Sequence, residues 1–205
     1  ALEKTNYRDF GKEVFPASLR ARHVQIHLFD GYWEDIGTIW SFYNANLQLT
    51  SPNAPFKLIS PLAPIYSRAR FLPPSRIEGA TIRNSLVADG CIIEEGAVIE
   101  NSIIGLRCMV GRNVRVRDSI LMGNDYYETP DQLSTGRNDD CPPLGVGENS
   151  VIERAIIDKN CRIGRNVEIT GHRDAENSEE TRFGMVRDGI FVAPKDTVLP
   201  DGWRL

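Results

Sequence analysis

Aliphatic residues recur at a nearly constant interval through the second half of the chain. Counting by six from Ala80 gives Leu86, Ile92, Val98, Ile104, Val110, Val116 and Met122. Helices repeat about every 3.6 residues and simple strands about every two, so neither explains this period. A six-residue period is typical of a parallel β-helix, in which each repeat forms one short strand and one corner. We therefore expect these aliphatic side chains to point inward and to stack from coil to coil.

Small residues and loop-forming segments complete this pattern. Gly90, Gly96, Ser102 and Cys108 lie two positions before an aliphatic residue, and Gly105 and Gly111 lie one position after, where we expect a corner that favours glycine. The segment GNDYYETPDQLSTGRNDDCPPLGVGENS is rich in Gly, Pro, Asp and Asn and predicts a loop that leaves the coil. The pattern resumes at Val151, Ile157, Ile163 and Ile169 and, after a second polar interruption, at Val192 and Val198.

The first fifty residues follow other patterns. NYRDFGKEVFPASL predicts a short helix ending near Pro16, HVQIHLF alternates like a strand, and TIWSFYNANLQLT predicts a helix with Thr38 as its N-cap. One strand between two helices is typical of α/β folds but cannot form a domain. We therefore predict the edge of an α/β domain at residues 1–50, a Pro-rich linker at 51–75 and a β-helix at 76–205.

Composition and charge narrow the function classes. The 205 residues include 24 Lys and Arg against 28 Asp and Glu, a formal charge of −4, which argues against a nucleic-acid-binding protein. No apolar run is long enough to span a bilayer. The four cysteines form no CxxC pair, and three lie within apolar repeats, so we expect buried, reduced thiols. Residue 1 is alanine, which is consistent with a processed or excised chain.

A candidate metal-binding residue lies in the segment GYWEDIGT. Asp35 follows a predicted strand and precedes a predicted helix, a position suited to holding Mg²⁺ against substrate phosphates. The alternative is that Glu34 or Asp35 only caps that helix, and spacing alone favours this alternative. Trp33 is able to stack on a sugar or base, although aromatic residues in such positions more often belong to the core.

Cationic residues near the predicted β-helix form a second candidate site. Arg68 and Arg70 lie on the same side of an extended segment, Lys159 lies at a corner beside Asp158, and Lys195 lies in VAPKDTVLP. Arg and Lys side chains bind phosphorylated small molecules through charge-assisted hydrogen bonds. Ordinary solvated lysines at coil corners remain the better interpretation for any one of them taken alone.

Several motifs together resemble the carboxy-terminal half of ADP-glucose pyrophosphorylase (glucose-1-phosphate adenylyltransferase). The motifs occur in the family's order between about residues 8 and 170: DFGKEVFP, GYWEDIGTIWSFYNANLQL, RFLPPS, SIIGLRCMVGRNVRVRDSILMGNDYYE and RAIIDKNCRIGRNVEI. The resemblance implies a mainly β fold, a left-handed parallel β-helix preceded by the α/β tail of a Rossmann-like nucleotidyltransferase domain. It weakens beyond residue 170.

The resemblance also implies an activity and the residues that serve it. The family makes ADP-glucose and pyrophosphate from ATP and glucose 1-phosphate, for glycogen or starch synthesis. Asp35 falls on the aspartate that helps to hold Mg²⁺, and Trp33 and Glu34 lie beside it as expected substrate-binding residues. The glycine-rich nucleotide loop and a partner aspartate are not in this sequence, so we expect the chain alone to be inactive.

The cationic residues gain a role from the same resemblance. Arg70, Lys159 and Lys195 match effector-site residues of plant-type members, Arg68 replaces a polar residue there, and Asp158 precedes the lysine as in the family. In those enzymes 3-phosphoglycerate activates and inorganic phosphate inhibits. The family forms tetramers, and its location would be cytoplasmic in a bacterium or the plastid stroma in a plant.

Two alternatives remain open at this point. A hexapeptide-repeat acyltransferase would need a catalytic histidine, for which His172 in the second polar interruption is the candidate, but GYWEDIGT has no place in that scheme. A non-catalytic regulatory or scaffold subunit would keep the β-helix and an anion site without the chemistry. Stabilisation by phosphate, 3-phosphoglycerate or acetyl-CoA would separate these alternatives, since a ligand stabilises only the protein that binds it.

Overall fold

The computed structural model describes residues 6–135 and 141–205. The chain divides into two units, Ala1–Trp33 and Glu34–Leu205, and each is described by itself. The described residues contain no helix that is long and apolar enough to cross a membrane.

The described part of the first unit contains two consecutive helical segments. The π-helix η2 (Phe10–Val14) leads directly into the helix α1 (Phe15–Ala21). Pro16 lies in the first turn of α1, where a backbone N–H would have no helical partner, so proline begins this helix instead of ending it. Our prediction of a helix ending near Pro16 was therefore wrong by about one and a half turns of α-helix.

The segment HVQIHLF was expected to form a strand, and this prediction was also wrong. Residues 23–29 are exposed and belong to no strand of the structure. A strand is stabilised by backbone hydrogen bonds to a neighbouring strand, and no described residue pairs with this segment. Alternation of polar and apolar residues describes the faces of a strand but does not supply its partner.

The helix α2 (Ile39–Gln48) confirms the predicted N-cap. Thr38 Oγ1 accepts a hydrogen bond from Ser41 N at 3.0 Å, and Thr38 N donates to Ser41 Oγ at 3.1 Å, a reciprocal capping box. The cap is Thr38, so the alternative that Glu34 or Asp35 caps this helix was wrong. Residues 51–75 follow as turns and extended backbone without helix or strand.

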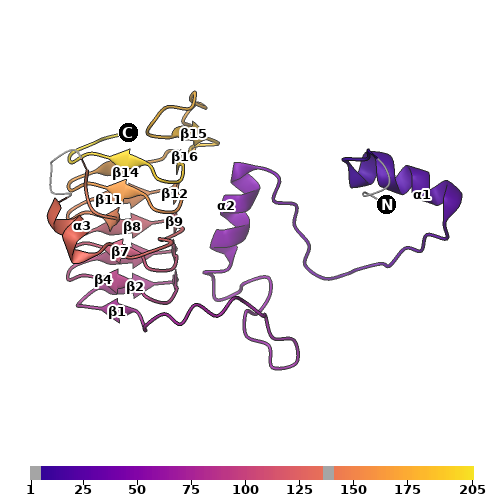
Figure 1. The fold of residues 1–205 in the computed structure, drawn as a ribbon, viewed down its shortest axis with the longest axis horizontal. Coiled ribbons are helices and arrows are strands. Elements are labelled where there is room, and N and C mark those ends of the chain that lie inside the picture. Colours follow the sequence, from indigo (N-terminus) through magenta and orange to yellow (C-terminus); the bar gives the residue numbers. More distant parts are fainter. Residues whose placement is uncertain (1–5, 136–140) are drawn as a thin grey trace. The chain divides into compact units, whose positions relative to one another are not determined.

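A parallel β-helix occupies the rest of the second unit (Figure 1). Sheet A contains β1 (Arg76–Ile77), β4 (Ile92–Ile93), β7 (Met109–Val110), β10 (Gly145–Val146), β13 (Arg162–Ile163) and β17 (Val198–Leu199). Sheet B contains β2 (Thr81–Arg83), β5 (Val98–Glu100), β8 (Arg115–Arg117), β11 (Val151–Glu153) and β14 (Glu168–Thr170). Sheet C contains β3 (Leu86–Val87), β6 (Ile103–Ile104), β9 (Ile120–Leu121), β12 (Ala155–Ile157), β16 (Ile190–Ala193) and the antiparallel β15 (Met185–Arg187).

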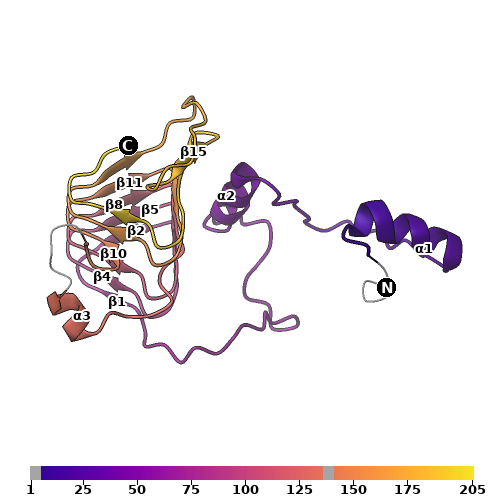
Figure 2. The ribbon, with the colours of Figure 1, turned by 45° about the horizontal axis from the view of Figure 1, so that its top comes forward.

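Two helices lie beside this β-helix (Figure 2). On sheet C, α2 buries Tyr43 against Ile120 and Ile156, and Tyr43 Oη donates to the carbonyl of Asp118 at 2.5 Å. The guanidinium of Arg154 lies over the Tyr43 ring, 5.7 Å from its centroid. The short helix α3 (Pro130–Thr135) belongs to the predicted loop between β9 and β10, on the side of sheet A.

The coil has 17 residues, and this corrects the predicted inward positions. Ile92 pairs with Met109 and Ile103 with Ile120, in each case 17 residues apart, so one corner per coil is a residue shorter than a six-residue repeat allows. The fully buried side chains consequently follow steps of six, five and six residues: Ile93, Ile99, Ile104, Val110, Val116 and Leu121. Of the positions predicted to point inward, Ile92, Val98, Val151 and Val198 are only half-buried, and the residue after each is buried instead.

A column of serines closes the shorter corner. Ser85, Ser102 and Ser119 occupy equivalent positions in successive coils, and the hydroxyl of each accepts a backbone N–H from the next coil. Each hydroxyl also donates to the carbonyl two residues before it, at 2.6–2.7 Å. The serine hydroxyl thus takes the place of the backbone group that the shorter corner lacks. Among the described residues, every buried side-chain polar atom has a hydrogen-bond partner.

Asparagine and aspartate, together with glycine, shape the corners. The left-handed backbone region is occupied by Asn84, Asn101, Asn113, Asp118, Asn149, Asn160, Asn166, Asp188 and Asp196, residues whose short polar side chains tolerate it. Gly105 and Gly111 are not in this region, so our reason for them was wrong. Gly105 is needed for close approach instead, because a Cβ there would lie 2.3 Å from the carbonyl oxygen of Met122 in the next coil.

The thiols follow the prediction. Cys91, Cys108 and Cys161 are buried and free, and Cys141 is exposed and free. Burial disfavours the thiolate and raises the pKa of Cys161 to about 12. These three side chains fill the core of the β-helix as small apolar groups.

Candidate functional site

Two of the predicted cationic residues meet at one corner of the β-helix. Lys159 lies between β12 and β13, and Lys195 lies between β16 and β17, the equivalent position of the adjacent coil. Asp196 N donates to the carbonyl of Lys159 at 2.9 Å, which stacks the two corners directly. Residues 36 positions apart in the sequence therefore present their side chains side by side.

Both ammonium groups converge on Asp125, a residue that the sequence analysis did not select. Lys159 Nζ donates to Asp125 Oδ1 at 2.8 Å, and Lys195 Nζ donates to Asp125 Oδ2 at 2.9 Å. The hydrogen bonds from Lys159 and Lys195 hold the pKa of the Asp125 carboxyl well below its usual range. The hydrogen bond to Asp125 in turn raises the pKa of Lys195. We call Asp125, Lys159 and Lys195 the lysine corner.

Asp158 has a local role at this corner. Its carboxylate accepts a hydrogen bond from the backbone N–H of Lys159 at 2.7 Å. The buried Asn160 follows and accepts the backbone N–H of Asp125 on its Oδ1 at 2.8 Å. Asp158 and Asn160 thus fix the backbone of the corner, while the two lysines supply its charge.

The structure does not bring the two predicted arginines to the lysine corner. Arg68 and Arg70 are exposed in the segment between α2 and β1, and neither forms an ion pair or hydrogen bond with Asp125. The guanidinium of Arg70 donates to the carbonyl of Arg68 at 3.4 Å, and no described carboxylate lies within ion-pair distance of either guanidinium. Their predicted role in anion binding stays a prediction.

The predicted active-site segment is exposed. Trp33 ends the first unit with 75% of its surface accessible, and Glu34 and Asp35 begin the second, three or four residues before the Thr38 cap. The described residues contain no group of three His, Cys, Asp or Glu side chains arranged to hold a metal ion. Asp35 offers the carboxylate oxygen that Mg²⁺ prefers, but among these residues it has no second protein ligand beside it.

The histidine considered for acyl transfer is also exposed. His172 lies in the polar segment between β14 and β15, and its backbone carbonyl accepts a hydrogen bond from Ala175 N at 3.0 Å. His172 does not line the cleft beside sheet A that is described below.

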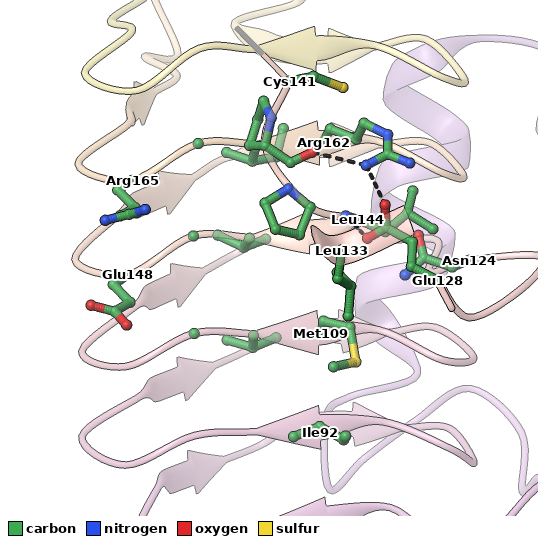
Figure 3. Close-up of a pocket in the computed structure, with 18 of the residues that line it drawn as sticks. Ile92, Met109, Asn124, Glu128, Leu133, Cys141, Leu144, Glu148, Arg162 and Arg165 are labelled. Atoms are coloured by element: carbon green, nitrogen blue, oxygen red, sulfur yellow. Dashed lines mark hydrogen bonds and ion pairs between the residues drawn. The ribbon is translucent and has the colours of Figure 1, made fainter. Parts of the chain in front are cut away.

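A cleft of about 680 Å³ between sheet A and the loop after β9 was not predicted (Figure 3). Met109, Leu133 and Leu144 contribute apolar surface to its walls. At one side Arg162 Nη1 donates to Glu128 Oε1 at 2.6 Å, with 20% and 9% of the two side chains accessible. Glu128 Oε2 also accepts the backbone N–H of Leu144 at 2.8 Å. This pair fastens the loop to the sheet and is too buried and too fully bonded to serve as a free anion site.

The segment GNDYYE contacts three places on the β-helix. Asp125 binds the two lysines, Tyr127 Oη donates to the carbonyl of Gly90 at 2.8 Å, and Glu128 binds Arg162. The motif stood inside the stretch that we had interpreted as a loop. Its two acids and two tyrosines could have indicated these contacts, because a solvated loop has no need of two aromatic residues beside two carboxylates.

Comparison with protein-family models adds two matches that follow one another along the chain. Residues 1–52 match the nucleotidyl transferase family. Residues 70–203 match the GLGC left-handed parallel β-helix domain, which gives the hand of the coil. Together they fit the carboxy-terminal portion of an ADP-glucose pyrophosphorylase, as the motifs had suggested, and they identify a relative of nucleotidyltransferase-type enzymes. With well over half of its length matched, the chain belongs to the family of the GLGC left-handed parallel β-helix domain.

Proposed function

We propose that this chain is part of an enzyme that makes ADP-glucose and pyrophosphate from ATP and glucose 1-phosphate, and that it carries the enzyme's allosteric β-helix. The observation behind this proposal is the order of the two matches, a nucleotidyl transferase segment followed by a GLGC β-helix in one chain. Neither a β-helix alone nor a nucleotidyltransferase edge alone would favour this reaction.

In the proposed reaction a phosphate oxygen of glucose 1-phosphate attacks the α-phosphorus of ATP, and pyrophosphate leaves. Asp35 would contribute one carboxylate oxygen to Mg²⁺, which when bound neutralises phosphate charge and orients the reacting groups. Trp33 and Glu34 would lie against the substrate, and the exposure of all three side chains leaves them free to meet it. The chain's own contribution is position and charge, with no covalent step.

The proposed effector site is the lysine corner. Two ammonium groups already hold the two oxygens of one carboxylate at 2.8 and 2.9 Å, a spacing that also suits the oxygens of a phosphate group. Arg68 and Arg70 would add charge if the exposed segment that carries them were to fold over the ligand. Inorganic phosphate or a phosphorylated metabolite such as 3-phosphoglycerate is the ligand class that we propose.

We also propose that the enzyme is a homo- or hetero-tetramer. Four large apolar side chains of the segment between α2 and β1 are almost fully exposed: Ile59, Leu62, Tyr66 and Phe71. Exposed apolar groups in such number are typical of surfaces that contact another chain. Multi-angle light scattering at two protein concentrations would measure the mass and would contradict the proposal if only a monomer were found.

The activity is tested on two proteins, the 205-residue chain and the product of the complete open reading frame. ADP-glucose formation from ATP and glucose 1-phosphate is measured with MgCl₂, with EDTA, and with phosphate or 3-phosphoglycerate added. We expect the complete product to be active, and phosphate or 3-phosphoglycerate to change its rate. Anion binding by the chain without activity in either protein would instead favour a regulatory subunit, and transfer from acetyl-CoA would favour an acyltransferase.

A further inference from the structure

We propose that Asp125 is a built-in competitor for the anion that binds Lys159 and Lys195. In the absence of ligand its carboxylate takes the place of the incoming phosphate, and a ligand binds only when this carboxylate moves away. The inference rests on the proposed function of the lysine corner as an anion site, and it adds a residue that sets the affinity of that site.

The geometry is that of an occupied anion site. Each lysine gives one charge-assisted hydrogen bond to a different oxygen of the same carboxylate, at 2.8 and 2.9 Å. A single carboxylate therefore satisfies both cations at once, as a phosphate with two oxygens directed at the corner would. The two lysines come from adjacent coils and Asp125 from the loop after β9, so the acid is brought there by the fold and not by its neighbours in sequence.

The position of Asp125 allows the exchange. Between 39% and 48% of each of the three side chains is accessible, so dissolved anions reach the corner. The backbone N–H of Asp125 donates to Asn160 Oδ1 at 2.8 Å, so the segment stays attached when the carboxylate turns away. The exchange also breaks the long hydrogen bond of 3.4 Å that Asn160 Nδ2 donates to Asp125 Oδ2. The Glu128–Arg162 pair, which joins the same loop to β13, is the opposite case: it is largely buried and bonded on several sides, and it is structural (Figure 3).

The charge at the corner explains what Asp125 does to affinity. With its carboxylate in place the three head groups carry one net positive charge, and without it they carry two. Asp158 and Asp196 are the nearby acids that also favour the charged form of Lys195, but neither bonds to a lysine ammonium group. An incoming anion must therefore displace the carboxylate of Asp125, whereas Asp158 and Asp196 act on it only through charge repulsion over a longer distance. While Asp125 occupies the two lysines, the site cannot bind an anion. The apparent affinity is therefore the intrinsic affinity multiplied by the fraction of molecules in which the site is open.

Calorimetric titration of the 205-residue chain with inorganic phosphate tests the proposal. We expect Asp125→Asn, which keeps the size of the side chain, to tighten phosphate binding about three- to ten-fold. Asp196→Asn is the matched control, because it removes one negative charge next to Lys195. Asparagine also tolerates the left-handed backbone at this position, where φ is 63°. We expect Asp196→Asn to change affinity less than about two-fold, as for a screened charge at a distance.

The double variant Asp125→Asn/Lys159→Gln separates the two proposals. Loss of the tightened binding in this variant places the phosphate at the lysine corner and supports the inference. Unchanged or weaker binding in Asp125→Asn, with binding still lost in Lys159→Gln, would overturn the competitor and leave the anion site standing. Phosphate binding that is unchanged when Lys159 or Lys195 is substituted would overturn both the anion site and the competitor.

A second measurement on the unmodified chain does not depend on any variant folding. The carboxyl ¹³C resonance of Asp125 is titrated with pH, with and without saturating phosphate. We expect the pKa of Asp125 to rise toward its ordinary range when phosphate is bound, because the two ammonium groups are then withdrawn from it. An unmoved pKa at saturating phosphate would show that Asp125 stays on the lysines and would refute competition.

Discussion

Removal of a single hydroxyl group, that of Ser119, should destabilise the β-helix measurably. The side chain is fully buried, its Oγ donates to the carbonyl of Arg117 at 2.7 Å, and it accepts the backbone N–H of Ala155 at 3.1 Å. Ser119→Ala removes both hydrogen bonds and leaves the Ala155 N–H inside the coil without this partner. An unpaired buried donor costs about 1–3 kcal/mol, and the lost bond to Arg117 adds to that.

We therefore expect Ser119→Ala to lower the free energy of unfolding by about 2 kcal/mol. For a chain of this size the corresponding decrease in Tm is about 4–8 °C. Urea unfolding followed by far-UV circular dichroism measures the free energy, and a thermal melt of the same samples gives Tm. The slope with urea should not change, because the surface exposed on unfolding is almost the same.

Ser67→Ala is the matched control, since it deletes the same hydroxyl from an exposed residue in the segment between α2 and β1. Ser67 forms no side-chain hydrogen bond with the described residues, so its loss should change the unfolding free energy by less than about 0.5 kcal/mol. If the two variants unfold at the same urea concentration, the serine column does not stabilise the short corner and our account of the 17-residue coil is refuted.

Other substitutions test the packing of α2 and the close contacts between coils. Tyr43→Phe removes the hydroxyl that donates to Asp118 and should cost about 1 kcal/mol in urea unfolding at pH 7. Burial raises the pKa of Tyr43 from 10.0 to about 12, so the stabilisation by its neutral form should decline as the pH rises through that range. The difference in unfolding free energy between the unmodified chain and Tyr43→Phe should therefore be smaller at pH 11 than at pH 7. A difference that does not change with pH would contradict the shift. Gly105→Ala should cost about 2–3 kcal/mol, because the new Cβ would meet the Met122 carbonyl. Gly202→Ala, with open space at φ 70°, should cost only about 1 kcal/mol, and equal Tm values for the two glycine variants would contradict this reasoning.

Periodic and local features were the ones that the sequence predicted correctly. The recurrence of aliphatic residues indicated the parallel β-helix, and Thr38 as a predicted N-cap indicated the start of α2. Buried thiols were expected because three cysteines lie within apolar repeats. Each of these features is decided by residues close together in the chain, where side-chain spacing and backbone preference act directly.

Predictions that depended on a distant partner were wrong or incomplete. The segment at residues 23–29 alternates like a strand but has no neighbouring strand among the described residues, and the inward positions are displaced by a corner that serine hydroxyls of adjacent coils complete. The sequence identified Lys159 and Lys195 but not Asp125, which lies 34 and 70 residues away from them. No pattern of spacing connects these three residues.

The sequence by itself determined that this chain forms a β-helix, because a repeated pattern of apolar residues admits one regular way of burying them. It also placed lysines at the corners, where the pattern leaves polar residues facing water. Only the tertiary structure decided which corners adjoin, how many residues each coil takes, and which carboxylate meets the lysines. Those facts depend on the stacking of coils and on the path of the loop after β9, and both are properties of contacts between residues far apart in the chain.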